Sequence, residues 1–261
     1  MNDFKEKLPT IVTALLVGAA LGHGPIHQLS HYHEFADQTG RFGVDHFADV
    51  ASNLGFLLVA LWGFVRLAPQ QTHPAMAGAW AGYRLFLIGL LLTAFGSAYY
   101  HLAPDDARLV WDRLPIALAC AGLLAGAWSD THDRPSANPA ALLALFAVAS
   151  VAWWYFGALA GNDDLRPYLM LQVLPFVLIP LWQSSYDVRP YDRWYFGAAL
   201  LLYAAAKGAE VGDHQIAALL GVTGHTLKHL LATLSSALIV AALDRRVRCV
   251  ARGSVAAVGI Q

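Results

Sequence analysis

Eight apolar runs, each close to the length that crosses a bilayer as a helix, dominate this 261-residue chain. A transmembrane helix needs about 20 mainly apolar residues. The runs fall at about 8–23, 49–67, 84–102, 109–128, 140–160, 166–183, 193–211 and 223–243. Only 13% of the residues are charged, about half the share usual for a soluble domain, and the mean hydropathy is +0.47. The sequence therefore predicts an all-α polytopic membrane bundle.

We expect three parts along the chain. Residues 1–30 form an N-terminal hydrophobic segment that is either an extra span or signal-like, because Lys5 and Lys7 precede a short apolar core. Residues 31–243 form a seven-span core. Residues 244–261 form a basic tail that we expect in the cytoplasm.

Basic residues in the connections predict the orientation, because cytoplasmic loops are enriched in lysine and arginine. With eight spans and a cytoplasmic N-terminus, eleven basic residues lie on the cytoplasmic side and four on the outer side. The four outer ones are Arg41, Arg108, Arg113 and Arg166. We therefore expect both termini in the cytoplasm, and the end of span 84–102 and the start of span 223–243 near the outer face. The net charge of −1 gives no reason to expect a nucleic-acid partner.

Polar side chains occur at these two span ends. Ser97 and His101 are four residues apart, as are His225 and His229, so each pair shares one face of a helix. Asp112 follows near the start of the next span. Three imidazoles from two helices suit zinc, which takes three protein ligands and a water when it is catalytic. We therefore predict a zinc site formed by the three histidines, with Ser97 and Asp112 beside it.

Other interpretations of these residues stay open. A His-x-x-x-His pair also suits bis-imidazole haem ligation or a proton relay, and a histidine in a membrane helix can be a hydrogen-bonded core residue. A purely structural role would leave five polar groups at one membrane level without a task. Each one that lacks a partner would cost several kcal/mol, so a metal site is the favoured hypothesis.

The loop at about 24–48 is unusually rich in titratable groups. It contains four histidines, His27, His31, His33 and His46. We expect either a solvated cap or a segment that covers or supports the metal site. A second metal site from His31 and His33 is less favoured, because alternate residues share a face only in an extended segment.

Three charged residues near the end of the 193–211 run have two possible roles. Lys207 and Glu210 have the i, i+3 spacing of a helical ion pair, which is the favoured interpretation. Asp213 is either structural or accepts a hydrogen bond from a zinc-bound imidazole.

Together the motifs resemble the alkaline ceramidase family. The resemblance rests on Gly96-Ser97-Ala-Tyr-Tyr-His101, on Trp111-Asp112-Arg-Leu114-Pro115, and on His225-x-x-x-His229. The segment Asp49-Val-Ala-Ser52-Asn53 is similar to the one that opens the family's first core span. The resemblance covers about residues 31–243. The family belongs to a wider group of seven-span membrane hydrolases that includes progestin and adiponectin receptors and haemolysin-III-like proteins.

The resemblance implies a hydrolase that cleaves a lipid amide from the bilayer, ceramide first, into a fatty acid and a sphingoid base. By position, it makes His101, His225 and His229 the zinc ligands, Asp112 the acid–base group and Ser97 the group that steadies the oxyanion. A receptor that does not turn over substrate is the alternative on the same scaffold.

The resemblance gives little support to a calcium site. Animal ceramidases carry an acidic, tryptophan-containing calcium segment ahead of the first core span. Residues 31–37 of this chain instead have histidines where carboxylates would be expected. Calcium prefers six to eight oxygen ligands, which these residues do not supply.

Overall fold

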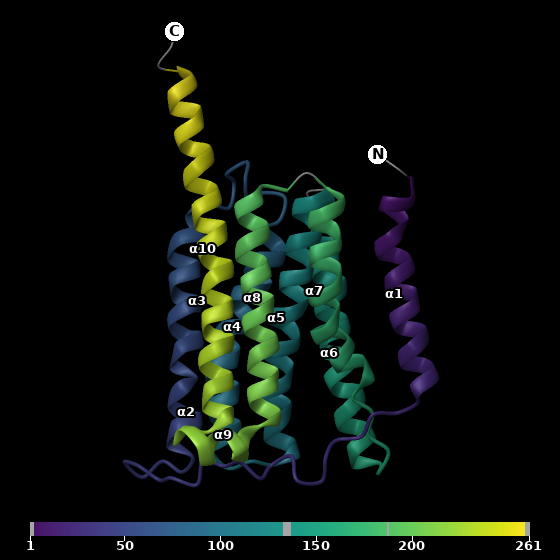
Figure 1. The fold of residues 1–261 in the computed structure, drawn as a ribbon, viewed down its shortest axis with the longest axis vertical. Coiled ribbons are helices and arrows are strands. Elements are labelled where there is room, and N and C mark those ends of the chain that lie inside the picture. Colours follow the sequence, from purple (N-terminus) through teal and green to yellow (C-terminus); the bar gives the residue numbers. More distant parts are fainter. Residues whose placement is uncertain (1–2, 133–136, 187, 259–261) are drawn as a thin grey trace.

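A computed structural model describes residues 3–132, 137–186 and 188–258, and these residues form a helical bundle without a β-strand (Figure 1). The long helices are α1 (Asp3–His23), α3 (Leu54–Leu67), α4 (Trp80–Leu102), α5 (Asp106–His132), α6 (Asn138–Leu159), α7 (Arg166–Ser185), α8 (Pro190–Val211) and α10 (Gly224–Val258). The short elements are α2 (Phe47–Ser52), which leads into α3, a 3-10 turn (Ala68–Gln70), and α9 (Asp213–Leu220), which joins α8 to α10. The predicted class, an all-α polytopic bundle, is confirmed.

Within the described residues, six helices are long and apolar enough to cross a membrane. They are the continuous Phe47–Gln70 segment, α4, α5, α6, α7 and the Gly224–Cys249 part of α10. A helix pairs its own backbone polar groups, which the hydrocarbon core requires. Each of the eight predicted ranges corresponds to a helix. Two of these helices are not among the six: α8, which carries Lys207 and Glu210, and α1, whose apolar part is only Lys7–His23. Figure 1 shows α8 between α10 and α7, and α1 at the edge of the bundle.

Glycines at every seventh position of α4 allow it to lie directly against α5. This glycine seam consists of Gly82, Gly89 and Gly96. A Cβ added to Gly89 would lie 2.5 Å from the backbone nitrogen of Ala119, and one added to Gly96 would lie 2.0 Å from the carbonyl oxygen of Trp111. Small residues at such spacings let membrane helices approach closely. The seam thus fixes the end of α4 that carries Ser97 against the start of α5.

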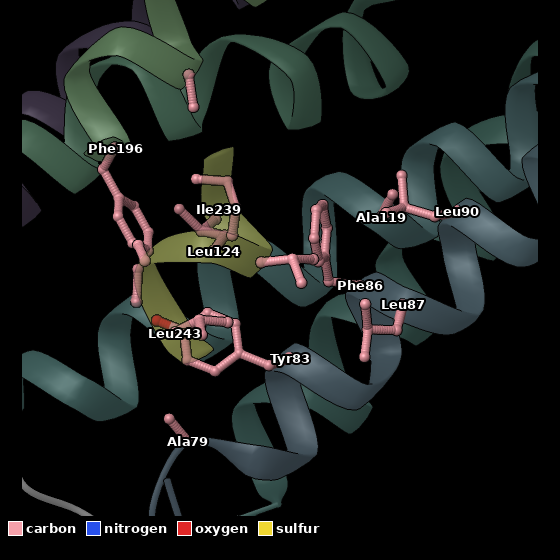
Figure 2. Close-up of a cluster of buried hydrophobic side chains, with 14 of the residues drawn as sticks. Ala79, Tyr83, Phe86, Leu87, Leu90, Ala119, Leu124, Phe196, Ile239 and Leu243 are labelled. Carbon is pink, nitrogen blue, oxygen red and sulfur yellow. The ribbon is translucent and has the colours of Figure 1, made fainter. Parts of the chain in front are cut away.

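The larger apolar core lies among α3, α4, α5, α7, α8 and α10, and a second, smaller one lies mainly among α5, α6 and α7. Figure 2 shows part of the larger core, formed by the labelled residues Ala79, Tyr83, Phe86, Leu87, Leu90, Ala119, Leu124, Phe196, Ile239 and Leu243. Other large apolar side chains, such as Leu145 and Phe156 of α6, remain exposed on the outside of the bundle. Apolar side chains facing outward are expected where helices contact lipid.

The two ends of the bundle differ. The start of α1 and the end of α10 lie at one end, whereas α2, α9 and the first loop lie at the other (Figure 1). α10 continues without a break past residue 243, the predicted end of the seven-span core, into the predicted tail. Residues 1–2 and 259–261 of the two predicted terminal segments lie outside the described residues.

Two of the arginines used to predict the orientation are buried in helices. Arg113 lies in α5 and is 2% exposed. Arg246 lies in α10, where it pairs with Asp130 at 2.5 Å and with Asp192 at 3.3 Å. Leaving out Arg113 and Arg246 removes one arginine from the outer side and one from the cytoplasmic side. The excess of basic residues on the side of the termini therefore remains.

Candidate metal centre

Three histidines from two helices meet at the end of the bundle opposite the termini. His101 lies in the last turn of α4, and His225 and His229 lie in the first two turns of α10. All three are buried, their candidate ligand atoms lie within 4.8 Å of one another, and the Nε2 atoms of His101 and His225 are 3.1 Å apart. Tetrahedral zinc, with bonds of about 2.0–2.1 Å, places its nitrogen ligands about 3.3–3.4 Å apart. The predicted histidine group therefore forms, and its spacing is suitable for a metal ion.

Several polar atoms around this group are buried without a hydrogen-bond partner among the described residues. They are Nδ1 of His101, Nε2 of His229, Oγ of Ser97 and Oδ1 of Asp112. Buried polar atoms are nearly always paired, so a cluster of unpaired ones indicates a ligand, an ion or bound water. Three imidazoles beside a hydroxyl and a carboxylate form a donor set that fits zinc.

The short helix α2 supports α10 from the side. The hydroxyl of Ser52 lies 2.8 Å from Nδ1 of His229, which leaves Nε2 for the metal. Asp49 accepts hydrogen bonds from the hydroxyls of Thr223, at 3.2 Å, and Thr226, at 2.6 Å. Partners of this kind orient metal-binding histidines in many proteins. The sequence offered the motif that contains Asp49 and Ser52, but not these contacts across the chain.

Asp213 bonds to main-chain groups rather than to an imidazole. Its two carboxylate oxygens accept hydrogen bonds from the backbone N–H groups of His225 and Ala36, both at 2.8 Å. The first N–H groups of a helix have no partner within the helix, so Asp213 satisfies one of them in α10. Of its two predicted roles, the structural one agrees with these contacts.

Lys207 and Glu210 form the predicted ion pair, and Lys228 joins it from α10. The Lys228 ammonium lies 3.0 Å from a Glu210 oxygen and 2.8 Å from Nε2 of His225. Lys228 follows His225 by three residues, and this helical spacing was the available signal for its position. The charged group therefore contacts the histidine cluster directly.

The first loop covers the histidines. The ring of Phe35 is 5% exposed, and its centroid lies 4.7 Å from that of His101 and 4.5 Å from that of His225. Asp37 holds the next part of the loop by accepting hydrogen bonds from Thr39 and from the first N–H groups of α2. Partial burial raises the pKa of Asp37, but these donors outweigh it and keep that pKa below its ordinary value. Of the two predicted roles of the loop, a cover agrees with these contacts.

The loop histidines make separate contacts. His33 lies 2.9 Å from the Tyr100 hydroxyl and 3.1 Å from Asp106. His27 pairs with Asp163 at 3.0 Å, and His46 contacts the backbone oxygen of Asp37. His101, His225 and His229 are the only group of three or more metal-ligating side chains found within the described part of the chain.

A cavity of about 190 Å³ extends from the histidine end into the bundle. Ser97, Asp112 and His229 line it at that end. Deeper in the bundle its walls include Phe86 and Ile239. Because Ile239 follows His229 by ten residues of α10, the cavity reaches about 15 Å along that helix. The walls are mainly apolar, so the cavity suits an elongated hydrophobic molecule.

Comparisons with models of protein families, with curated proteins and with solved structures give no match.

Proposed function

We propose that this protein is a zinc-dependent membrane amidase that hydrolyses a lipid amide, with ceramide as the substrate implied by its motifs. One observation carries the proposal. Three buried imidazoles converge at the end of an apolar cavity, beside the Ser97 hydroxyl and the Asp112 Oδ1 atom, which have no hydrogen-bond partner among the described residues. Zinc would be held by His101, His225 and His229, and when bound it lowers the pKa of water to about 7 and polarises a carbonyl.

The chain's own residues supply the other requirements of amide hydrolysis. Asp112 accepts the proton of the attacking water and returns it to the departing amine. The Ser97 hydroxyl donates a hydrogen bond to the amide oxygen as negative charge develops on it. The cavity holds the acyl chain, and Phe35 shields the reacting group from bulk water.

The alternatives for the histidines are less well supported. Bis-imidazole haem ligation needs two imidazoles on opposite faces of a planar macrocycle, whereas here three rings lie with centroids 4.6–5.2 Å apart. A receptor on the same scaffold would keep the zinc but would not turn over substrate.

Metal content and hydrolysis together test the proposal. Purified protein in lipid nanodiscs is expected to contain about one zinc per chain and to release fatty acid from ceramide. Zinc without hydrolysis of any lipid amide would favour the receptor. Iron with a haem absorption band, or no metal at all, would contradict the proposal.

A further inference from the structure

Arg113 is a buried cation that the proposed mechanism does not use. It is 2% exposed, and its guanidinium carbon lies 4.0 Å from the ring centroid of Trp154, 5.0 Å from that of Tyr32 and 5.4 Å from that of Tyr168. Two of its nitrogens, Nε and Nη1, have no hydrogen-bond partner among the described residues. No carboxylate in the described part of the chain forms an ion pair with it. Aromatic rings stabilise its charge but leave these N–H donors unpaired.

Arg113 lines the same cavity as Ser97, Asp112 and His229. It follows Asp112 directly, so the Cα atoms of the two residues are about 3.8 Å apart. A group bound by Arg113 would therefore lie close to the reacting amide.

The other charges on the cavity wall do not neutralise Arg113. Glu210 is already shared between Lys207 and Lys228. Asp112 is the remaining carboxylate of the wall, and the proposed mechanism uses it for proton transfer. Three cations therefore share the wall with two carboxylates, each of which has another role. A buried charge is costly unless it is paired, so the cavity favours an anionic ligand.

We infer that the substrate is an acidic lipid amide, whose amine part carries a carboxylate or another anionic oxygen group that binds Arg113. This inference rests on the proposed amidase function, but it replaces ceramide, which carries no negative charge, with an acidic amide as the preferred substrate. The reaction adds one water to the amide: a C–O bond forms, the C–N bond breaks, and the water supplies the proton that leaves with the amine. The products are a fatty acid and an acidic amine such as an amino acid.

Matched pairs of lipid amides test the inference on the intact protein in nanodiscs. N-palmitoyl-serine and its methyl ester share the acyl chain and the amide but differ in one negative charge. N-palmitoyl-ethanolamine and its phosphate ester make the same comparison for a phosphate. We expect kcat/KM for the acid of at least one pair to exceed that of its neutral partner by about tenfold or more. Equal values in both pairs, or a preference for the neutral compounds, would overturn the inference.

Variants of Arg113 connect the preference to this side chain. In Arg113→Met the ratio of acid to neutral kcat/KM should fall by about tenfold or more, to about one or below, since the anionic group loses its partner. Arg113→Lys keeps the positive charge but not the planar guanidinium with its two parallel N–H donors. Its ratio of acid to neutral kcat/KM should therefore lie between those of wild type and Arg113→Met. Arg108→Met is the matched control, because Arg108 lies on the same helix over the Tyr99 ring and does not line the cavity. An unchanged ratio in Arg113→Met would contradict the assignment.

A binding measurement separates this inference from the amidase proposal. Binding of the two serine lipids is measured in Asp112→Asn protein, with and without Arg113→Met. Suppose the acid binds more tightly than the ester only when Arg113 is present, but wild-type protein hydrolyses neither lipid. That result would support an acidic ligand at Arg113 and contradict the amidase function. If both are hydrolysed alike, the amidase stands and the acidic ligand fails. If neither lipid binds or is hydrolysed, both fail.

Discussion

The three histidines are held in different ways, although all three are buried. His229 has the Ser52 hydroxyl on Nδ1 and no partner on Nε2, whereas Nε2 of His225 contacts both His101 and Lys228. A zinc ion held by only three protein ligands has no other side chain to replace a lost one. Replacing any one of the three histidines should therefore release the metal.

We expect alanine at His101, His225 or His229 to abolish bound zinc and hydrolysis. His31→Ala is the control, because His31 is an exposed loop histidine. Zinc is measured by elemental analysis of purified protein, with folding followed by size-exclusion chromatography. Full zinc content in the folded His101→Ala protein would remove that residue from the ligand set.

Asp112 should matter for turnover and not for metal. Asp112→Asn keeps the shape of the side chain but cannot accept a proton, so zinc should stay while kcat falls by about 10²–10⁴. Ser97→Ala should also keep zinc and lose less activity. Asp105→Asn, at an exposed carboxylate just before α5, serves as the control. A wild-type rate in Asp112→Asn would show that the acid–base assignment is wrong.

Ser52 should set the strength of zinc binding through His229. Ser52→Ala removes the group beside Nδ1, so we expect zinc affinity to fall by about 10–100-fold without loss of the fold. Ser184→Ala is a matched control, because this hydroxyl bonds only to the backbone oxygen of Leu181 at the opposite end of the bundle. Competition with a zinc chelator measures both variants, and equal affinities would argue against a role for Ser52.

The residues whose grouping was predictable share a local sequence signal. Spacing by four put Ser97 with His101 and His225 with His229, because a helix repeats every 3.6 residues. Phe35 and Ser52 have no such signal, since their contacts with the histidines join segments more than 60 residues apart in sequence. Arg113 lies within the predicted span 109–128 and was counted with the outer basic residues, because hydropathy does not reveal that its side chain is buried against Trp154.

Among the helices, α4 and α5 show most clearly how packing fixes the site. The glycine seam brings their backbones together, so the position of Ser97 relative to Asp112 depends on the absence of side chains at Gly82, Gly89 and Gly96. Adding atoms at such a contact forces the helices apart.

Gly89→Ala should therefore lower stability by about 1–3 kcal/mol. Gly197→Ala is the control, because a Cβ there meets nothing within 4 Å, and it should leave stability unchanged or slightly raised. Thermal unfolding in the same detergent compares the two variants. The seam would lose its proposed importance if Gly89→Ala unfolded at the same temperature as Gly197→Ala.

Helix positions were largely predictable, because a bilayer demands long apolar segments with internally paired backbones. Each of the eight predicted ranges corresponds to helix in the structure, apart from the turn at Asn53, and α10 extends beyond its apolar part. The break between α2 and α3, the short α9 and the seven-residue repeat of the glycine seam were not predicted. Each depends on which helices become neighbours, and hydropathy does not contain that information.

For the whole molecule, the histidine centre and the two termini lie at opposite ends of the bundle (Figure 1). The basic residues predict that the termini face the cytoplasm, so the centre should face outward. Its substrate would then come from the outer leaflet.

Cysteine labelling tests this orientation. In a Cys120→Ser, Cys249→Ser background, Asp105→Cys lies at the histidine end and should react with an impermeant thiol reagent in intact cells. Gln71→Cys is exposed, directly after the 3-10 turn that ends the α3 segment, at the opposite end of the bundle. It should react only after the membrane is opened. The reverse pattern would place the centre on the cytoplasmic side.

The anchoring of the first loop also determines the order in which the molecule can be completed. Ala36, beside Phe35, is held by Asp213, a residue 177 positions later in the chain. Gln28 is held by Asp163, 135 positions later. During synthesis the Gln28 end of the loop can therefore be held once Asp163 has emerged after α6, whereas the Ala36 end stays free while α3 to α8 are inserted. The Ala36 end closes over the histidines only when α9 and α10 emerge, and α10 carries two of the three histidines. Metal capture and closure of the cover would thus belong to the same stage of assembly, after α9 and α10 have emerged.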